Sequence, residues 1–483
     1  MVALIAALAP LSILIQGGTI IDGTGAPGFV GDLRIEGQRI VAIARHLEPS
    51  PDDLVVPARG LVVAPGFIDA HSHADGGIGD DPLAVSQVTQ GITTAVVGQD
   101  GIWDKPVKES LAELQALRPA INFAAFSGHG GIRAKVMGDD YKRAATNAEI
   151  AEMTKLVQQD MKDGALGLSS GLEYDPGYYS DTKELVAMAK EVAPFGGLYI
   201  SHMRDEGDRT FEAIAELRSI GLAAGIRSQI SHIKLGTASV WGRANEAAAF
   251  TQDPLVSADV YPYTYWQSTI AALSPSRDWA DRRIWVKALA DVGGPGNIRL
   301  SKFSPDRSWE GKTIAEISKS TGKDAISVIQ EVLERTRDGR GSQSVVVTAM
   351  QESDLEVFVK APRIMFCSDG SIGGSHPRGA GTFPRIFAQF VRGKRLLTIQ
   401  EAIRKMTSLT ARTFGLRDRG ELKPNAIADI AVFDPATIQD RATPADPKRL
   451  SQGMAFVFVG GRMVLKSGQP TGARPGVAIL RNR

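Results

Sequence analysis

The stretch Ala64–Asp75 constrains the fold of this chain more than any other. An apolar run from Leu61 to Ala64 leads into it and predicts a buried strand. His71 and His73 follow, and residues two apart on a strand point the same way. Because neutral imidazole is a favoured zinc ligand, this pair predicts half of a divalent-metal site at a strand end. For an isolated His-x-His pair, the alternative is two surface histidines in a turn.

The residues around this pair resemble the first barrel strand of the amidohydrolase superfamily. That strand carries Pro-Gly-x-x-Asp-x-His-x-His, which here runs from Pro65 to His73. The resemblance implies a (β/α)8 barrel with one or two metals at the mouth, where the C-terminal ends of the strands meet. It therefore predicts further metal ligands at the ends of later strands.

The size and charge of the chain are compatible with such a barrel. Its 483 residues suffice for a barrel of about 250 residues with additions. The net charge of +1 argues against a nucleic-acid-binding surface. The single cysteine, Cys367, excludes an internal disulfide framework, and no apolar run has the length of a membrane span.

The first residues leave two locations open. Val2–Ile15 is an apolar stretch interrupted by Pro10, and Ala7–Ala9 resembles the cleavage triplet of a signal peptide. No lysine or arginine precedes this stretch, since the first is Arg34. This pattern favours an uncleaved, cytoplasmic protein, with export as the alternative.

The strand and helix patterns predict an α/β fold with two parts. Closely spaced short strands at 12–45 and 428–465 predict that both termini pair into one small β-sandwich. We assign residues 1–62 and 417–483 to that domain. Between them, alternating strands and helices predict a parallel sheet with helical crossovers, the (β/α)8 TIM barrel of residues 63–416.

One segment of the barrel region does not fit a tight crossover. Residues 277–345 contain helical patterns but no barrel strand, and they predict an insertion between strands seven and eight. A role as a lid over the mouth and a plain packing role remain alternatives. After the first strand, the other barrel strands are predicted at 93–98, 122–126, 165–170, 198–201, 227–231, 256–260 and 364–368.

The histidines gather at the ends of these predicted strands. The chain has seven histidines, and five of them fall there: His71, His73, His129, His202 and His232. Histidines with scattered structural roles would not sort in this way. The pattern predicts a metal site, and the carboxylate that ends strand eight, Asp369, stands beside it.

Further motifs resemble the N-acyl-D-amino-acid deacylases, or D-aminoacylases, of this superfamily. They are Tyr199–Gly207, Ser231–Lys234, Ser368–Gly370, His376–Arg378 and Gly381–Arg385. The resemblance extends from Gly17 to Pro435 apart from the insertion. It implies that His71, His73, His202, His232 and Asp369 bind metal, in the ligand order of the superfamily. It also implies a cofactor of one or two Zn2+ ions.

The chain departs from the family pattern after strand two. That family usually carries Gly-Asn-Cys-Gly there, with a metal-binding cysteine, whereas this chain has Gly98-Gln99-Asp100-Gly101. Asp100 could replace the thiolate, because carboxylates also bind zinc. Glu173, just past strand four, is the other candidate, and its place favours it as a bridge between two metals. Loss of the sulfur ligand also makes Mn2+ or another divalent metal an alternative.

The resemblance assigns roles to the remaining site residues. Asp369 would take a proton from metal-activated water and pass it to the leaving nitrogen. His129 would touch the intermediate or brace the site. Four further residues would bind the substrate, including its α-carboxylate: Lys234, Arg378, Tyr174 and Tyr265. An aromatic cluster would line the pocket or pack at the rim of the barrel. It contains Tyr265 together with Tyr261, Tyr263 and Trp266.

These observations predict a metal-dependent hydrolase that cleaves N-acyl-D-amino acids into a carboxylate and a free D-amino acid. The enzymatic alternatives are a dipeptidase, a cyclic-amide hydrolase or another amidohydrolase. The non-enzymatic alternative is a metal-free barrel that acts as a binding module. The expected partner is a small molecule with an amide and a free carboxylate, and homo-oligomerisation is left open.

Overall fold

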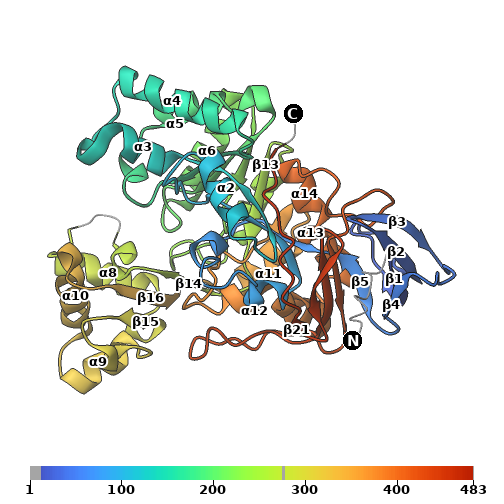
Figure 1. Ribbon diagram of the computed structural model, residues 1–483. Coiled ribbons are helices and arrows are strands. Elements are labelled where there is room, and N and C mark those ends of the chain that lie inside the picture. The colour runs from blue at the N-terminus through green and yellow to red at the C-terminus, as the bar shows by residue number, and fades with distance from the viewer. Residues whose placement is uncertain (1–11, 275–277, 482–483) are drawn as a thin grey trace, which may run out of the picture.

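The computed structural model describes residues 12–274 and 278–481. The predicted cleavage triplet, Ala7–Ala9, and Pro10 lie outside the described residues. Within the described part of the chain, no helix has the length and apolar character needed to cross a membrane. Figure 1 shows three regions, with a sheet from both termini on one side of the parallel strands and the insertion on the other.

Both termini contribute to one nine-stranded sheet, in the order β21-β20-β19-β18-β5-β1-β2-β3, with β4 paired to β1. Its strands are β1 (Ser12–Ile20), β2 (Phe29–Glu36), β3 (Arg39–Ala44), β4 (Asp53–Pro57), β5 (Val62–Pro65), β18 (Ile430–Phe433), β19 (Met454–Val459), β20 (Arg462–Lys466) and β21 (Gln469–Pro470). The β-sandwich predicted from the termini is therefore one hydrogen-bonded sheet. The N–H of Ile40 donates to the carbonyl of Ala426 at 2.9 Å. The edge strand β3 is therefore also hydrogen-bonded to the segment that precedes β18.

Eight consecutive parallel segments form the centre of the molecule. They are β6 (Phe67–Asp69), β7 (Ile92–Val97), β8 (Asn122–Ala125) continued by β9 (Ser127–Gly128), β10 (Gly167–Gly171), β11 (Leu198–His202), β12 (Arg227–Ile230), β13 (Val256–Val260) and β17 (Ile364–Phe366). Sheet pairing runs β6-β7-β8 and β9-β10-β11-β12-β13-β17. The carboxylate of Asp69 links the last segment to the first. It accepts hydrogen bonds from the backbone N–H of Ser368 at 2.7 Å and from the hydroxyl of Ser368 at 2.5 Å. The order of these strands is the one expected for a (β/α)8 barrel.

The first barrel strand begins later than the sequence predicts. The apolar run at 61–64 lies mostly in β5, which pairs with β1 and β18 of the terminal sheet. Gly66 then separates β5 from β6. A Cβ atom at Gly66 would lie 2.3 Å from the side chain of Thr93 on β7. The glycine therefore allows the chain to pass from one sheet to the other at close contact.

Helices follow most of the barrel strands. They are α1 (Val85–Val88), α2 (Val107–Ala116), α3 (His129–Met137), α4 (Asn147–Lys162), α5 (Thr182–Lys190), α6 (Thr210–Ala224), α7 (Ala244–Ala249), α11 (Glu352–Lys360), α12 (Arg378–Arg385), α13 (Ile399–Met406) and α14 (Ser408–Phe414). Helix α4 matches the sequence prediction at 147–163. Its start is fixed by a capping box, in which the Thr146 hydroxyl accepts the N–H of Glu149 and Glu149 accepts that of Thr146.

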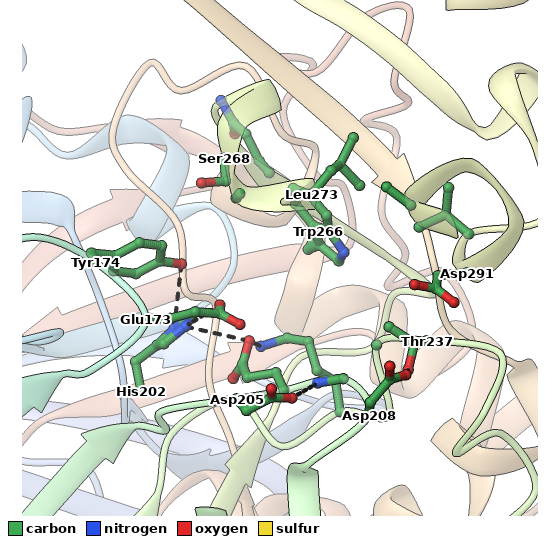
Figure 2. A pocket seen from close by; sticks show the side chains of 18 of the residues that line it. Glu173, Tyr174, His202, Asp205, Asp208, Thr237, Trp266, Ser268, Leu273 and Asp291 are labelled. Carbon is green, nitrogen blue, oxygen red and sulfur yellow. Dashed lines mark hydrogen bonds and ion pairs between the residues drawn. The ribbon is translucent and has the colours of Figure 1, made fainter. Parts of the chain in front are cut away.

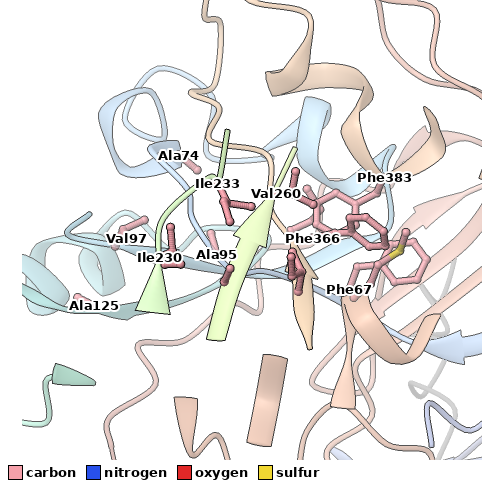
Figure 3. Close-up of a cluster of buried hydrophobic side chains, with 14 of the residues drawn as sticks. Phe67, Ala74, Ala95, Val97, Ala125, Ile230, Ile233, Val260, Phe366 and Phe383 are labelled. Atoms are coloured by element: carbon pink, nitrogen blue, oxygen red, sulfur yellow. The ribbon is translucent and has the colours of Figure 1, made fainter. Parts of the chain in front are cut away.

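The barrel strands are buried on both faces. Successive residues alternate between two hydrophobic clusters, as in β17, where Ile364 and Phe366 belong to one and Met365 to the other. This alternation is expected for strands that pack against helices on one face and the barrel interior on the other. Figure 3 shows the first cluster, where Phe67 of β6 packs beside Phe383 of α12.

The insertion is larger than predicted and has its own sheet. It contains β14 (Tyr265–Ser268), β15 (Ile298–Phe303) and β16 (Gln343–Thr348), with helices α8 (Arg282–Asp291), α9 (Ile314–Thr321) and α10 (Ala325–Thr336). The antiparallel sheet has the order β14-β16-β15. A separate hydrophobic cluster around the fully buried Trp285 holds these elements together. The three strands are absent from the sequence prediction, which recognised only helices here.

Candidate metal centre and substrate pocket

The predicted metal ligands come from the C-terminal ends of six barrel strands. His71 and His73 follow β6, Asp100 follows β7 and Glu173 follows β10. His202 is the last residue of β11. His232 and Asp369 follow β12 and β17. Active sites of barrels of this type lie at this end, because the loops there converge.

One group of four ligands lies around the first strand. It contains His71, His73, Asp100 and Asp369. Their ligand atoms lie within 4.8 Å of one another. The Nε2 atom of His71 is 3.4 Å from Oδ1 of Asp100, and that of His73 is 3.3 Å from Oδ2 of the same residue. Asp369 Oδ1 lies 3.3 Å from His73 Nε2 and 3.7 Å from His71 Nε2.

A second group joins the first through Asp100. It contains Asp100, His202 and His232. Nδ1 of His202 is 3.2 Å from Nε2 of His232. Asp100 Oδ1 is 3.6 Å from His232 Nε2. A third group contains Glu173, His202 and Glu206, and Oε2 of Glu173 is 3.0 Å from Nε2 of His202. The sequence favours Glu173 as the bridge between two metals, and Asp100 is the residue that the first two groups share.

The donor atoms at this site fit a metal cation. Both ring nitrogens of His71 are buried and have no hydrogen-bond partner, and neither has Oδ1 of Asp100. Unpaired buried polar atoms are costly, and a cation would satisfy one ring nitrogen of His71 together with Oδ1 of Asp100. Burial alone would lower the pKa of His73, but Asp100 and Asp369 raise it to about 10. The carboxylates therefore make this point of the protein favourable for positive charge.

Three of the site residues adopt an uncommon backbone conformation. The φ angles of Asp100, His232 and Asp369 are 54°, 32° and 49°. Such angles cost energy for residues other than glycine and cluster at functional sites. The neighbouring carboxylate of Asp259 stabilises one of them, because its Oδ1 accepts the backbone N–H of His232 at 2.7 Å.

Glu206 is a site residue that the sequence reasoning did not single out. It lies four residues after His202 and is nearly buried. Its carboxylate is 3.1 Å from Nδ1 of His232 and accepts a hydrogen bond from Nζ of Lys234 at 2.5 Å. Burial opposes ionisation of Glu206, but the charges of His202 and Lys234 hold its pKa below the usual range. The signal that could have identified it is its place inside the motif Tyr199–Gly207.

A pocket of about 430 Å³ opens beside these residues. Its inner side contains Glu173, His202 and Asp369, and its outer side is formed by the insertion. Figure 2 shows Trp266 and Leu273 of the insertion across the pocket from Glu173 and His202. The insertion therefore forms a wall of the pocket, which goes beyond the plain packing role.

Three of the four predicted substrate-binding residues line this pocket. They are Lys234, Arg378 and Tyr174. Arg378 forms an ion pair with Asp369, with Nη1 2.6 Å from Oδ2, and its buried Nε has no hydrogen-bond partner. Burial alone would raise the pKa of Asp369, but the charges of Arg378 and His232 keep it below the usual range.

Tyr265 is placed differently from the prediction. It is absent from the pocket lining, and its ring stacks on His376 with centroids 4.8 Å apart. Trp266, the next residue of β14, lines the pocket instead. Because neighbouring residues on a strand face opposite sides, a shift of one position decides which aromatic ring reaches the substrate.

His129 is also outside the three ligand groups and outside the pocket lining. It is fully buried at the start of α3, with Nε2 2.8 Å from Oε1 of Glu184. Arg133 contacts the other oxygen of Glu184 and donates to the carbonyl of Tyr141 at 3.1 Å. These contacts match the bracing role considered for His129 and do not place it against a substrate.

Comparisons with known proteins agree with these features. The amidohydrolase family model matches residues 54–230 and 313–471. A D-aminoacylase from Alcaligenes xylosoxydans xylosoxydans is 33% identical over 98% of both chains. An N-acyl-D-glutamate deacylase from the same organism is 34% identical over 98% of this chain and 97% of its own.

A solved structure extends the similarity to three dimensions. It is the N-acyl-D-glutamate deacylase from Bordetella bronchiseptica, complexed with zinc and a phosphonate inhibitor that mimics the tetrahedral intermediate. It has a TM-score of 0.85 and 34% identity, covering 98% of this chain and 100% of that chain. The chain therefore belongs to the amidohydrolase family, within its group of N-acyl-D-amino-acid deacylases.

Proposed function

We propose that this protein is a metal-dependent hydrolase that releases a carboxylate and a free D-amino acid from N-acyl-D-amino acids. The convergence of four histidines, Asp100 and Asp369 at one end of the barrel strands carries the proposal. The relatives support the same activity, since those compared are named as D-aminoacylase and N-acyl-D-glutamate deacylase. A metal-free binding module is disfavoured, because it would leave Oδ1 of Asp100 and the ligand nitrogen of His71 buried without partners.

The metal would be held by two overlapping sets of ligands. His71, His73 and Asp369 would form one set, and His202 with His232 the other, with Asp100 between them. Zinc is the first choice, because the residues are imidazoles and carboxylates and the solved relative contains zinc. Manganese is the alternative, since no thiolate is present. When bound, the metal would lower the pKa of a water molecule and polarise the amide carbonyl.

Asp369 would move the proton. Its carboxylate remains ionised beside Arg378, so it can accept a proton from the attacking water. It can then deliver that proton to the nitrogen that leaves. The contacts of Asp369 with His71 and His73 support this role.

Arg378 and Lys234 would hold the carboxylate of the substrate. Nε of Arg378 is a buried donor without a partner in the described chain, so it can bind an additional oxygen. Arginine presents a planar fork that suits a carboxylate. Tyr174 would close the same side, since its hydroxyl lies 3.5 Å from Nδ1 of His202.

A substrate panel tests this proposal against the enzymatic alternatives. Purified protein with zinc would be assayed with N-acetyl-D-amino acids, their L enantiomers, dipeptides and a cyclic amide. We expect hydrolysis of the D substrates, with free D-amino acid as the product. Faster turnover of a dipeptide or cyclic amide than of every N-acyl-D-amino acid would overturn the proposal.

A further inference from the structure

His376 lies between the barrel and the insertion, and both of its ring nitrogens are hydrogen-bonded to backbone groups. Nδ1 accepts the backbone N–H of Arg378, the first residue of α12, at 2.9 Å. Nε2 lies 3.0 Å from the carbonyl oxygen of Tyr265, the first residue of β14. A carbonyl oxygen only accepts, so Nε2 carries the hydrogen and Nδ1 the lone pair. The two bonds therefore require one neutral tautomer of the imidazole.

The surroundings of His376 favour this neutral ring. The residue is 3% exposed, and the centroid of its ring lies 4.8 Å from that of Tyr265 and 5.3 Å from that of Tyr263. Burial and the positive charge of Arg378 hold the pKa of His376 well below its usual range. His376 is not part of the lining of the pocket beside the metal ligands. Its effect on a bound substrate therefore passes through the residues that it holds.

The two residues that His376 holds belong to opposite sides of the pocket. Arg378 lies on the inner side, whereas Tyr265 begins β14, whose next three residues line the outer side. The other hydrogen bonds of β14 between described residues run to β16, a strand of the same insertion. Within the described chain, the imidazole of His376 thus provides the hydrogen bond that ties this outer wall to the barrel loops.

Other contacts hold the base of the insertion independently of His376. Nε of Arg385 donates to the carbonyl of Pro262 at 2.8 Å, in the connection between β13 and β14. The carbonyl of Thr264 accepts the N–H groups of Ala349 and Met350, both at 3.2 Å, where the chain returns from β16. Loss of His376 would therefore free β14 relative to α12 without detaching the insertion.

We propose that His376 is a positioning residue that holds the outer wall of the pocket at a fixed place relative to Arg378. The inference rests on the proposed function, which assigns Arg378 to the carboxylate of the substrate. The imidazole acts as a rigid spacer, because one nitrogen sets the start of α12 and the other sets β14. A substrate that spans the pocket then meets both walls in place, so less binding free energy is lost in ordering them.

Three substitutions separate the two hydrogen bonds. The side-chain oxygen of asparagine lies as many bonds from Cα as Nδ1 of histidine, so His376→Asn keeps an acceptor for Arg378 and cannot reach Tyr265. The amide nitrogen of glutamine lies as many bonds from Cα as Nε2, so His376→Gln keeps a donor for Tyr265 and loses the acceptor for Arg378. His376→Phe keeps a flat ring beside the tyrosines and loses both bonds.

The asparagine and glutamine variants should differ in the substrates that they affect. The substrates are the N-acetyl-D-amino acid that the original protein cleaves fastest and an amide without a carboxylate. We expect His376→Asn to raise KM at least about 5-fold for both, because the outer wall is held in place only part of the time. Its kcat should stay close to that of the original protein, since lost ground-state binding appears in KM. His376→Gln should raise KM for the N-acetyl-D-amino acid alone, because it displaces Arg378.

Hydrogen exchange provides a measurement that does not depend on activity. The amides of residues 265–268 should exchange at least about 5-fold faster in His376→Asn and His376→Phe than in the original protein, with unchanged metal content. In His376→Gln they should exchange at the original rate. His46→Asn is the matched control, because the side chain of His46 is 63% exposed and lies in the terminal domain. It should change neither KM nor exchange in this strand.

Two results would overturn the inference. One is a His376→Phe variant with the original KM, because packing of the ring would then suffice. The other is an equal effect of His376→Asn and His376→Gln on both substrates and on exchange, and this comparison decides the matter if the phenylalanine variant does not fold. If the original protein cleaves no N-acetyl-D-amino acid, the proposed function fails instead, and the exchange rates still decide whether His376 holds β14.

Discussion

Asp100 stands at the centre of the candidate metal centre. Its two oxygens lie between 3.3 and 3.6 Å from nitrogens of His71, His73 and His232. Its φ angle of 54° is one that aspartate and asparagine tolerate better than most residues. The carboxylate thus takes the position after strand two at which the sequence resemblance implies a cysteine.

Replacement of Asp100 by asparagine should remove most of the bound metal. Asparagine keeps the shape and the tolerance for positive φ but lacks the negative charge. We expect Asp100→Asn to weaken metal binding by at least about 100-fold, because even indirect partners of metal ligands contribute about 10- to 100-fold. Metal content per chain would be measured beside turnover.

Glu173→Gln is the matched comparison. Glu173 contacts His202 but lies outside the group that contains His71 and His73. We therefore expect this variant to retain more metal than Asp100→Asn. If Glu173→Gln loses its metal and Asp100→Asn keeps it, the bridge is Glu173, as the sequence pattern favours.

Arg378 allows a separate test of substrate binding. Arg378→Lys retains the positive charge but loses the planar fork, so the contacts with a carboxylate become weaker. We expect a loss of about 10- to 100-fold in kcat/KM for an N-acetyl-D-amino acid, equivalent to one or two hydrogen bonds to a charged group. An amide without a carboxylate is the control substrate. An equal loss on that substrate would show that Arg378 acts through Asp369 alone.

The sequence predicts individual ligands better than their partners. His71, His73, His202 and His232 stand in short motifs at strand ends, so the local pattern is sufficient. Glu206 becomes significant only because the loop after β11 folds back against His232 and Lys234. No local pattern contains that contact.

At the scale of elements, the insertion is the part that the sequence describes least well. Its helices are amphipathic and were recognised, whereas β14 is only four residues long and all four are partly buried. Such a strand has no clear alternation of apolar and polar residues. The aromatic cluster that the sequence placed at the pocket includes both Tyr265 and Trp266, and of these two only Trp266 is in the pocket lining.

The insertion should unfold locally when its core is disturbed. Trp285 on α8 is fully buried, and its indole N–H donates to the carbonyl of Trp279 at 3.0 Å. Trp285→Ala should destabilise the insertion by about 3–5 kcal/mol. Hydrogen exchange should accelerate in residues 278–348, and KM should rise because the outer wall is lost, while metal content stays unchanged.

Val286→Ala is the control on the same helix, because Val286 is 60% exposed. It should change stability by no more than about 0.5 kcal/mol. If Trp285→Ala strips the metal without faster exchange in the insertion, the insertion and the barrel do not behave as separate units.

At the scale of the whole molecule, the sequence predicted the pairing of the two termini and the order of the barrel strands. Strand runs are apolar and bounded by turn residues, so their positions are visible locally. The point where the chain leaves the terminal sheet was less visible. Only Pro65-Gly66 separates the apolar residues of β5 and β6 in the sequence, and Gly66, which lies close to Thr93, is where the chain passes from one sheet to the other.

The central claim is that a metal at the barrel mouth carries out amide hydrolysis. The most direct measurement follows one preparation through three states: as purified, after removal of metal by a chelator, and after addition of zinc. Turnover of N-acetyl-D-leucine and metal per chain would be recorded in each state. The account predicts that activity disappears with the metal and returns with one or two zinc ions per chain. Full activity in the metal-free protein would contradict it.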